Sequence, residues 1–335
     1  SYSSMATYIG YIGINANKWG VNFVWTGTAF GSCWYNQNWY VSSGGSIQTA
    51  VNNAAAGDTI YVDTGTYAEQ VVINKDLNLL SASFPVIQHP GGTLTSYTID
   101  SVVYEPLLYA YGCTVTIDGF DVDGTDAAGS NAFVGILLDD ATATVNDCEV
   151  HNMDAAASVN TYGVLVLGAS DADILGNEVR DFSAAGVAVM DATYCLVEDN
   201  YIDGVTGNSI AETGILLKDV TAGDVVGNSV FDCLESGLQA IGIKLYGGGD
   251  TIADNSVYDC DTGIWFDVDA TVTGNEVTGC EYGLQDYSAA TIECNNIHDN
   301  VKGMWIESDS TVQYNDVVDN TDYGIFVKDD AAVFH

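Results

Sequence analysis

The sequence predicts an all-β fold, a right-handed parallel β-helix of about eleven coils with a short N-terminal capping helix. The first observation behind this prediction is a repeated row over residues 213–335 that opens with glycine and an apolar-x-apolar triplet. The opening glycines are spaced by 28, 21, 20, 20 and 21 residues: Gly214, Gly242, Gly263, Gly283, Gly303 and Gly324. Earlier rows open at Gly135, Gly163 and Gly186, so we expect one continuous body.

An asparagine column is the second observation. Its members each lie two residues before Val or Ile: Asn177, Asn200, Asn228, Asn255, Asn275, Asn295 and Asn315. Two markers that share one period indicate a repeat architecture. We expect this asparagine ladder to point inward at a turn, with each amide bonding the next coil along the axis.

Short runs of alternating apolar residues identify the repeating element as a strand. Ile264 and Phe266 alternate in this way, and Val272 and Val277 lie in the next two runs of the same row. A period of two is typical of strands, whereas helical repeats show i, i+3, i+4 spacing. The rows lack the ladder of leucine-rich repeats and the strict six-residue period of left-handed β-helices. Three short strands per row, separated by Gly, Asn and Asp, therefore predict one coil of a right-handed β-helix.

Composition and charge exclude several classes of protein. The chain has 335 residues, with 46 acidic and seven basic residues and a formal net charge of −39. Such acidity argues against nucleic acid as a partner. No apolar stretch reaches 18 residues, so no membrane span is expected. The first residues lack a basic segment and a cleavage site, and we interpret the chain as a mature secreted form.

The N-terminal 45 residues differ from the rest. Residues 1–57 contain no Asp or Glu, and four of the six tryptophans precede residue 40. We predict an aromatic, acid-free arm over residues 1–45 and the β-helix over residues 46–335. Three roles stay open for the arm: extra strands that cover the same solenoid, a segment that packs on another subunit, or an aromatic ligand platform.

A capping helix is expected where the body begins. Ser46 is a suitable N-cap, and Ile47, Ala50, Val51 and Ala54 share one helical face before Gly57. The helix and the following GDTIYVDTGTYAEQVVINKDLNLL resemble the start of pectin-lyase-like right-handed β-helices, and the N-x-[VI] rows resemble their coils. The resemblance covers about residues 46–335 and implies the fold. The acidic, Tyr- and Gly-rich composition also resembles cell-surface and sheath proteins of methanogenic archaea.

Catalytic motifs of related carbohydrate-active families are absent. The Gly-His-Gly and Arg-Ile-Lys motifs of the similar polygalacturonases do not occur, and Arg180 is the single arginine available to a lyase or esterase set. His89, His151, His298 and His335 occupy different rows, without zinc spacing. We therefore predict no catalytic residues, no cofactor and no enzymatic activity. The aspartates that follow the Gly-led strands predict a solvated acidic edge, with calcium bridging as the alternative.

The eight cysteines fall into two groups. Cys233, Cys260 and Cys280 share one phase on successive rows, which predicts a ladder of buried thiols. The others lie in different phases and are candidates for disulfides between arm and body or between chains: Cys33, Cys113, Cys148, Cys195 and Cys294. We expect at least one such disulfide, with Cys33 the first candidate.

One outward column of the Gly-led strands is apolar. The second residue after each glycine should face outward, and seven of these nine residues are apolar: Leu137, Leu165, Ala188, Leu216, Lys244, Trp265, Gln285, Trp305 and Phe326. A stripe of this length exceeds what a soluble monomer normally exposes. We therefore predict an assembly interface made by Leu137, Leu165, Leu216, Trp265, Trp305 and Phe326.

These observations favour a structural protein of an extracellular assembly. We expect β-helix subunits that associate with one another as a homopolymer at the cell surface, in a surface layer, a sheath or a filament. The alternative is a polysaccharide-binding or polysaccharide-cleaving β-helix protein. In that case Trp265 and Trp305 would stack on sugar rings, and surface polysaccharide would be the partner.

Overall fold

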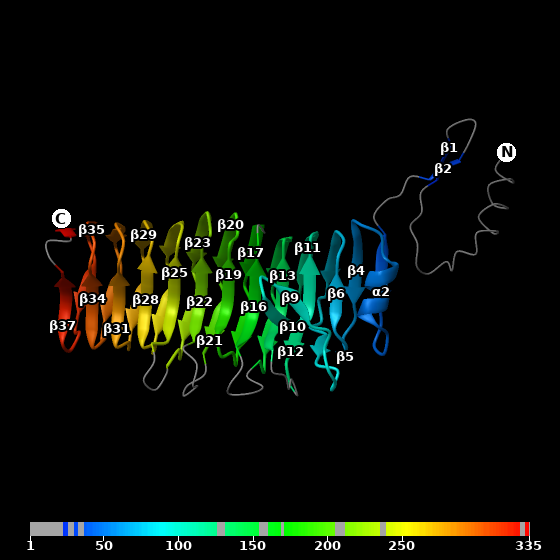
Figure 1. Cartoon of the computed structure of the whole chain (residues 1–335), viewed down its shortest axis with the longest axis horizontal. Helices are drawn as coiled ribbons and strands as arrows, with labels where there is room; N and C mark the ends of the chain where they lie inside the picture. The colour runs from blue at the N-terminus through cyan, green and yellow to red at the C-terminus, as the bar shows by residue number, and fades with distance from the viewer. Residues whose placement is uncertain are drawn as a thin grey trace.

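The computed structural model describes residues 23–25, 30–32, 37–125, 131–153, 160–168, 171–204, 212–234, 239–328 and 332–334. Within them the predicted fold is confirmed: the chain winds as a right-handed parallel β-helix with three long sheets along its axis (Figure 1). The coils follow one another in sequence order, and each strand pairs with its equivalent one coil away. In the described part of the chain, no helix is both long and apolar enough to cross a membrane.

The Gly-led triplets build the twelve-stranded sheet. Its strands are parallel except for β9, which pairs antiparallel with β10. Its members are β6 (Val71–Ile73), β9 (Tyr97–Ile99), β10 (Val102–Tyr111), β13 (Ala132–Asp139), β16 (Thr161–Leu167), β19 (Ala185–Met190), β22 (Thr213–Lys218), β25 (Ile241–Tyr246), β28 (Thr262–Asp267), β31 (Tyr282–Asp286), β34 (Lys302–Ile306) and β37 (Tyr323–Val327).

The second run of each row builds the thirteen-stranded sheet. Its members are β3 (Asn38–Val41), β4 (Asp58–Val62), β7 (Leu77–Leu80), β11 (Thr114–Asp118), β14 (Thr142–Asn146), β17 (Asp171–Leu175), β20 (Tyr194–Glu198), β23 (Ala222–Val226), β26 (Gly249–Ala253), β29 (Ala270–Thr273), β32 (Thr291–Glu293), β35 (Ser310–Gln313) and β38 (Ala332–Phe334).

The N-x-[VI] runs build the eleven-stranded sheet, which has the shortest strands. Its members are β5 (Thr66–Ala68), β8 (Val86–Gln88), β12 (Asp121–Asp123), β15 (Glu149–His151), β18 (Glu178–Arg180), β21 (Tyr201–Asp203), β24 (Ser229–Phe231), β27 (Ser256–Tyr258), β30 (Glu276–Thr278), β33 (Asn296–His298) and β36 (Asp316–Val318). Outside the three long sheets, β1 (Phe23–Trp25) and β2 (Phe30–Ser32) pair antiparallel.

The helix α2 (Ile47–Asn53) lies at the N-terminal end of the solenoid (Figure 1). The Ser46 hydroxyl accepts from the Thr49 amide, and the Glu69 carboxylate accepts from the Ile47 amide at 2.6 Å. Lys75 Nζ donates to the carbonyls of Val51 and Ala54, each at 3.0 Å. Both helix ends therefore have partners for groups that the helix itself leaves unpaired.

The solenoid begins before the boundary that the sequence suggested. Residues 38–41 form β3, which pairs in parallel with β4, and Trp39 Nε1 donates to Asp58 Oδ2 at 2.9 Å. The body therefore includes residues before Ser46, because this strand covers the edge of β4. Most of the predicted arm lies outside the described residues, and its three roles stay predictions.

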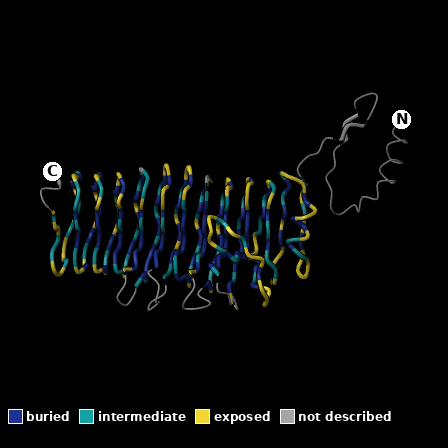
Figure 2. The backbone as a smooth tube through the Cα atoms, viewed as in Figure 1, coloured by how far each residue is buried: buried dark blue, intermediate teal, exposed yellow. Residues whose placement is uncertain are grey.

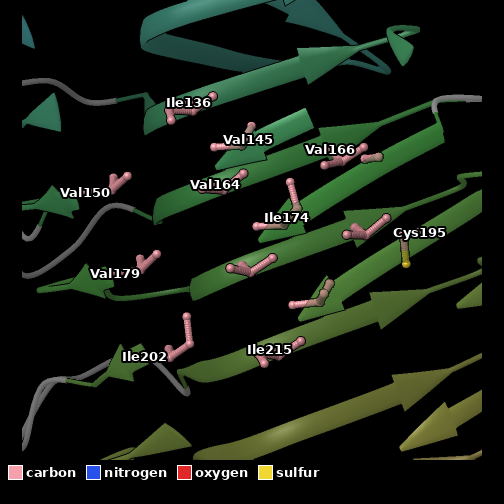
Figure 3. Close-up of a cluster of buried hydrophobic side chains, with 14 of the residues drawn as sticks. Ile136, Val145, Val150, Val164, Val166, Ile174, Val179, Cys195, Ile202 and Ile215 are labelled. Carbon is pink, nitrogen blue, oxygen red and sulfur yellow. The ribbon is translucent and has the colours of Figure 1, made fainter. Parts of the chain in front are cut away.

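Inward side chains of the three sheets meet in one continuous core. Valine and isoleucine at equivalent positions of successive coils stack in columns, as Figure 3 shows for Val150, Val179 and Ile202. Buried and more exposed residues alternate along most strands of the thirteen- and eleven-stranded sheets, and buried segments recur along the axis (Figure 2). Burial of each such side chain contributes about 1.5–3 kcal/mol, so the stacked columns are the main source of stability.

The predicted asparagine ladder lies at the corner between the thirteen- and eleven-stranded sheets. Asn228 Nδ2 donates to Asn255 Oδ1 at 2.9 Å, and Asn255 Nδ2 donates to Asn275 Oδ1 at 2.9 Å. The same pattern runs from Asn177 to Asn315. Six members are at most 2% exposed, and Asn315 is half-buried. The column therefore satisfies backbone groups that the turn would otherwise leave buried and unpaired.

Turn geometry accounts for part of the acidic composition. Twelve of the described aspartates have positive φ, mostly at the corners where a strand ends. One corner column runs through Asp199, Gly227, Asp254 and Gly274, with φ of 54°, 67°, 55° and 69°. Left-handed backbone costs most residues roughly 1–2 kcal/mol, whereas Gly, Asn and Asp tolerate it. These aspartates therefore meet a backbone requirement and need no bound cation to explain them. Calcium bridging stays a prediction.

A comparison of variants at Asp254 should separate backbone conformation from charge. We expect Asp254→Ala to lower the free energy of unfolding by about 1 kcal/mol, because alanine is strained at this positive φ. Asp254→Gly and Asp254→Asn should each stay within about 0.5 kcal/mol of the wild type. Urea denaturation followed by circular dichroism measures all three. Equal loss in the Asn and Ala variants would show that the carboxylate matters instead.

Candidate functional site

The outer face of the twelve-stranded sheet gathers most of the chain's described basic side chains and many of its aromatic rings. Over β22, β25, β28, β31, β34 and β37, three columns of side chains lie on the side of the sheet away from the core. We call these 18 residues the aromatic–lysine face: Thr213, Leu216, Lys218, Ile241, Lys244, Tyr246, Thr262, Trp265, Asp267, Tyr282, Gln285, Tyr287, Lys302, Trp305, Glu307, Tyr323, Phe326 and Lys328.

Trp265 is the first aromatic centre of this face. Its ring stacks on Tyr246 with a centroid distance of 6.5 Å, and Tyr287 lies on its other side at 5.5 Å. Lys244 Nζ lies 5.1 Å from the centroid of the same ring. Tyr246 is 45% exposed and Tyr287 is 37% exposed, so solvent reaches this cluster. A flat, amphipathic surface of this kind can stack against the apolar side of a sugar ring.

Trp305 is the second centre, two coils further along the axis. Phe326 stacks on it at 4.3 Å, and Tyr282 meets it edge to face at 6.4 Å. Trp305 Nε1 donates to Glu307 Oε1 at 2.8 Å, which fixes the indole ring. Because coils repeat at about 4.8 Å, the two indoles lie about 10 Å apart along the axis. One extended ligand can therefore contact both.

Charged groups lie between and beside the rings. Lys302 Nζ lies 3.9 Å from the Tyr282 centroid and donates to Glu281 Oε1 at 2.9 Å. Burial lowers the pKa of Lys302, but these two contacts outweigh it and hold the pKa above its usual value. Hydrogen bonds from Lys328 and Trp305 lower the pKa of Glu307. Burial raises the pKa of Tyr323 to about 12, so this phenol stays protonated at neutral pH.

The predicted assembly stripe divides into two parts. Leu137 and Leu165 are fully buried on the outer side of the sheet, so they cannot form a surface for a second subunit. β9 covers this region, and the Tyr97 ring packs against Tyr109 at 4.3 Å. Ala188 is buried in the same cluster. The chain therefore buries the N-terminal part of the stripe itself, in a cluster formed by side chains of β10, β13, β16 and β19 with Tyr97 and Ile99 of β9 packed against it.

The C-terminal part of the stripe remains accessible and belongs to the aromatic–lysine face. Leu216, Trp265 and Trp305 are half-buried, and Phe326 is 39% exposed. The sequence identified only this central column, two residues after each opening glycine. It missed the flanking columns, one residue before and four residues after that glycine, which contain Lys302, Tyr287 and Lys328. A count of basic and aromatic residues at these two positions of each row would have revealed the aromatic–lysine face.

The predicted cysteine ladder lies at the corner between the eleven- and twelve-stranded sheets. Cys233, Cys260 and Cys280 are at most 1% exposed. Burial raises the pKa of Cys260 well above its usual range, so this thiol is protonated at neutral pH. Of the five disulfide candidates, Cys113, Cys148, Cys195 and Cys294 are free thiols, and Cys33 lies outside the described residues. An intermolecular disulfide through Cys33 stays a prediction.

The remaining ionisable candidates are separate from the aromatic–lysine face. On the eleven-stranded sheet, Arg180 pairs with Glu149 and Glu178, and His151 contacts Asp121 at 2.8 Å. His298 contacts Asp299 at 2.8 Å on the same sheet. A hydrogen bond to the Asp121 carboxylate raises the pKa of His151. These are pairs of opposite charge on strands β15, β18, β12 and β33, not a nucleophile with a base and an orienting group.

The fold and the aromatic–lysine face together define the class of this protein. It is a right-handed parallel β-helix that carries aromatic rings on the outer face of one sheet. The chain belongs to the NosD family, whose description is "periplasmic copper-binding protein" and which matches residues 94–269 and 212–332. No curated protein sequence matches the chain.

Solved structures resemble the whole body of the solenoid at low sequence identity. The periplasmic alginate epimerase AlgG matches with a TM-score of 0.59 and 13% identity over 88% of this chain and 82% of the epimerase. The GH136 lacto-N-biosidase from Eubacterium ramulus matches with a TM-score of 0.59 and 12% identity, over 89% and 68% of the two chains. The Dettilon tailspike protein matches with a TM-score of 0.50 and 12% identity, over 81% and 62%.

The prediction that the chain is not an enzyme is wrong. It rested on motifs of polygalacturonases, pectate lyases and pectin esterases, and their absence excludes only those families. The epimerase and the biosidase are carbohydrate-acting enzymes on this same fold. An enzymatic role is therefore compatible with this sequence.

The described residues do not form a copper site. No group of three or more His, Cys, Asp or Glu side chains in the described ranges is placed to share a metal ion. Copper(I) binds thiolates, whereas the Cys260 thiol is fully buried and protonated at neutral pH. The described ranges therefore contain no cluster of His, Cys, Asp or Glu that would account for the copper binding in the family's description.

Proposed function

We propose that this protein is a secreted, carbohydrate-active β-helix protein that binds a polysaccharide along the aromatic–lysine face. The single observation that carries the proposal is the pair of solvent-accessible aromatic clusters around Trp265 and Trp305 on one straight sheet. The similar alginate epimerase and lacto-N-biosidase support the same class of ligand. The periplasmic location in the descriptions of the family and the epimerase favours a site outside the cytoplasm.

This proposal replaces the structural assembly that the sequence favoured. That interpretation needed a long apolar stripe to be covered by a second subunit. Leu137 and Leu165 are instead buried in a cluster of the chain's own side chains. What remains is a mixed surface of rings, lysines and hydroxyls, which suits a polar ligand with apolar faces better than a flat protein contact.

The function is tested by removing both indoles. We expect Trp265→Ala with Trp305→Ala to weaken polysaccharide binding about 100-fold, because stacking anchors of this kind dominate binding energy. Affinity electrophoresis in gels that contain a panel of bacterial polysaccharides measures the effect, and size-exclusion chromatography of the polysaccharide reports any cleavage.

A matched control removes a ring from another sheet. Tyr258 stacks on Phe231 at 4.9 Å on the outer side of the eleven-stranded sheet, on a different side of the coil from the lysines. Tyr258→Ala should leave polysaccharide binding unchanged. If the double tryptophan variant binds as the wild type does, the aromatic–lysine face is not the binding site. If no polysaccharide in the gel slows the migration of the wild type, the proposed function itself fails.

A further inference from the structure

The basic residues of this chain are concentrated on one face. The chain has only seven Lys and Arg residues, and four of them belong to the aromatic–lysine face: Lys218, Lys244, Lys302 and Lys328. Of the other three, Lys75 caps α2, Arg180 pairs with two glutamates and Lys18 lies outside the described residues. The described basic residues outside this face thus have partners within the chain that account for them.

Two of these lysines have no carboxylate partner among the residues that the structure describes. Lys302 pairs with Glu281, and Lys328 pairs with Glu307. Within the described ranges, neither Lys218 nor Lys244 forms an ion pair, although the chain contains 46 acidic residues. Lys218 is exposed on β22, and Lys244 is half-buried on the next strand, β25. Two ammonium groups without a carboxylate partner on neighbouring coils therefore lie beside the Trp265 cluster.

The half-buried position of the Lys244 ammonium group costs free energy of solvation unless a ligand compensates for this loss. Burial lowers the pKa of Lys244, and the partner that the structure gives its ammonium group is the Trp265 ring at 5.1 Å. A cation–π contact recovers only part of the free energy of solvation that the ammonium group loses on burial. A carboxylate or sulfate of a bound ligand would provide a charge-assisted hydrogen bond at this position.

The formal charge of the face is opposite to that of the whole chain. The 18 residues of the aromatic–lysine face include four lysines and two carboxylates, Asp267 and Glu307, which gives +2, and the Glu281 carboxylate that pairs with Lys302 lowers the local sum to +1. The chain as a whole has a formal charge of −39. At physiological ionic strength the Debye length is about 8 Å, so acids on the other sheets are largely screened from a ligand on this face.

We propose that the aromatic–lysine face selects an anionic polysaccharide, a polyuronate, whose carboxylates pair with Lys218 and Lys244 while its sugar rings stack on Trp265 and Trp305. This inference rests on the proposed function and names the chemical class of its ligand. The coil repeat places successive lysines and rings at about 4.8 Å steps along the axis. A regular polymer with one carboxylate per sugar can therefore make repeated contacts, whereas a neutral polymer uses only the rings.

The selectivity is tested with polymers that differ only in charge. Alginate, polygalacturonate and hyaluronate serve as anionic probes, and their carboxyl-reduced forms serve as neutral counterparts at 0.15 M ionic strength, where the Debye length is about 8 Å. We expect the wild type to bind at least one polyuronate about tenfold or more tightly than its reduced form. Lys218→Gln with Lys244→Gln should remove that preference, because each lost charge-assisted bond costs about tenfold in affinity.

Two controls separate the contribution of Lys218 and Lys244 to binding from the effect of net charge and from the contribution of the aromatic rings. Arg180→Gln and Lys244→Gln change the net charge by the same amount, but Arg180 lies on the eleven-stranded sheet, so only Lys244→Gln should weaken polyuronate binding. Trp265→Ala with Trp305→Ala should weaken binding of the anionic and reduced polymers alike. Equal affinity of the wild type for both forms, or an unchanged preference in the lysine variant, overturns the selectivity and leaves polysaccharide binding standing. Binding to neither form overturns both proposals.

Discussion

Asn255→Ala is expected to lower the free energy of unfolding by about 4 kcal/mol, which is among the largest effects of any single substitution in this chain. Asn255 Oδ1 accepts from both the amide and the Nδ2 of Asn228, each at 2.9 Å. Its Nδ2 donates to the Val225 carbonyl at 2.8 Å and to Asn275 Oδ1 at 2.9 Å. Removal of this amide leaves buried donors and acceptors unpaired on both neighbouring coils, each costing about 1–3 kcal/mol.

Two comparisons make this result specific to the ladder. Asn255→Asp keeps the size of the side chain but replaces the donating amide with a carboxylate oxygen that faces a carbonyl, so it should be at least as destabilising. Asn315→Ala lies at the half-buried end of the column, where solvent can replace the lost bonds, and should cost roughly 1–2 kcal/mol. Urea denaturation followed by circular dichroism measures the three variants. Equal losses at Asn255 and Asn315 would contradict the argument from burial.

Gly263→Ala is expected to destabilise the solenoid by about 3 kcal/mol. A Cβ at Gly263 would lie 2.4 Å from Val277 Cγ1 and 2.6 Å from the Gly283 carbonyl oxygen of the next coil. The valine belongs to the packed core and the carbonyl to the backbone of the next coil, so neither can move aside cheaply. The same crowding recurs at the opening glycines of the preceding rows, which explains why those rows begin with glycine.

The last row supplies the matched control. A methyl group added at Gly324 would have Val317 Cγ1 at 3.7 Å and the Val317 carbonyl oxygen at 3.8 Å as its nearest atoms, which are ordinary contacts. Gly324→Ala should therefore change stability by less than about 1 kcal/mol, with a small gain expected from the reduced entropy of the unfolded chain. Thermal melts of the two variants give the comparison. A similar drop in both melting temperatures would show that glycine is needed there for backbone reasons rather than for space.

The sequence predicted the fold well because its signals are local and repeat. Gly263 and Asn255 each report a steric or hydrogen-bonding requirement that recurs on many successive coils, so spacing alone identified these positions. The capping helix was visible for the same reason, since Ser46 and its apolar face are local patterns.

The candidate site was only partly predictable because it depends on contacts between coils and on insertions. Trp265 and Trp305 were recognised as possible sugar-stacking residues, but Tyr287 and Lys244 join them only through the register of β28, β25 and β31. The burial of Leu137 depends on β9, an antiparallel strand outside the repeat, which no period can reveal. Leu137 and Leu165 are therefore excluded from the predicted assembly interface, and its other members stay a prediction. Enzymatic activity was excluded on motifs of three families only.

The aspartates with positive φ have a consequence for how such a solenoid adapts. Asp254 occupies a corner that Gly227 and Gly274 fill one coil before and after, so the backbone accepts either residue there. Twelve described aspartates occupy such left-handed positions, and each could become asparagine or glycine with little effect on packing. The electrical character of the particle can therefore drift from strongly acidic toward neutral while its architecture stays constant. Adaptation to habitats of different salinity can therefore change the net charge of the protein without changing its fold.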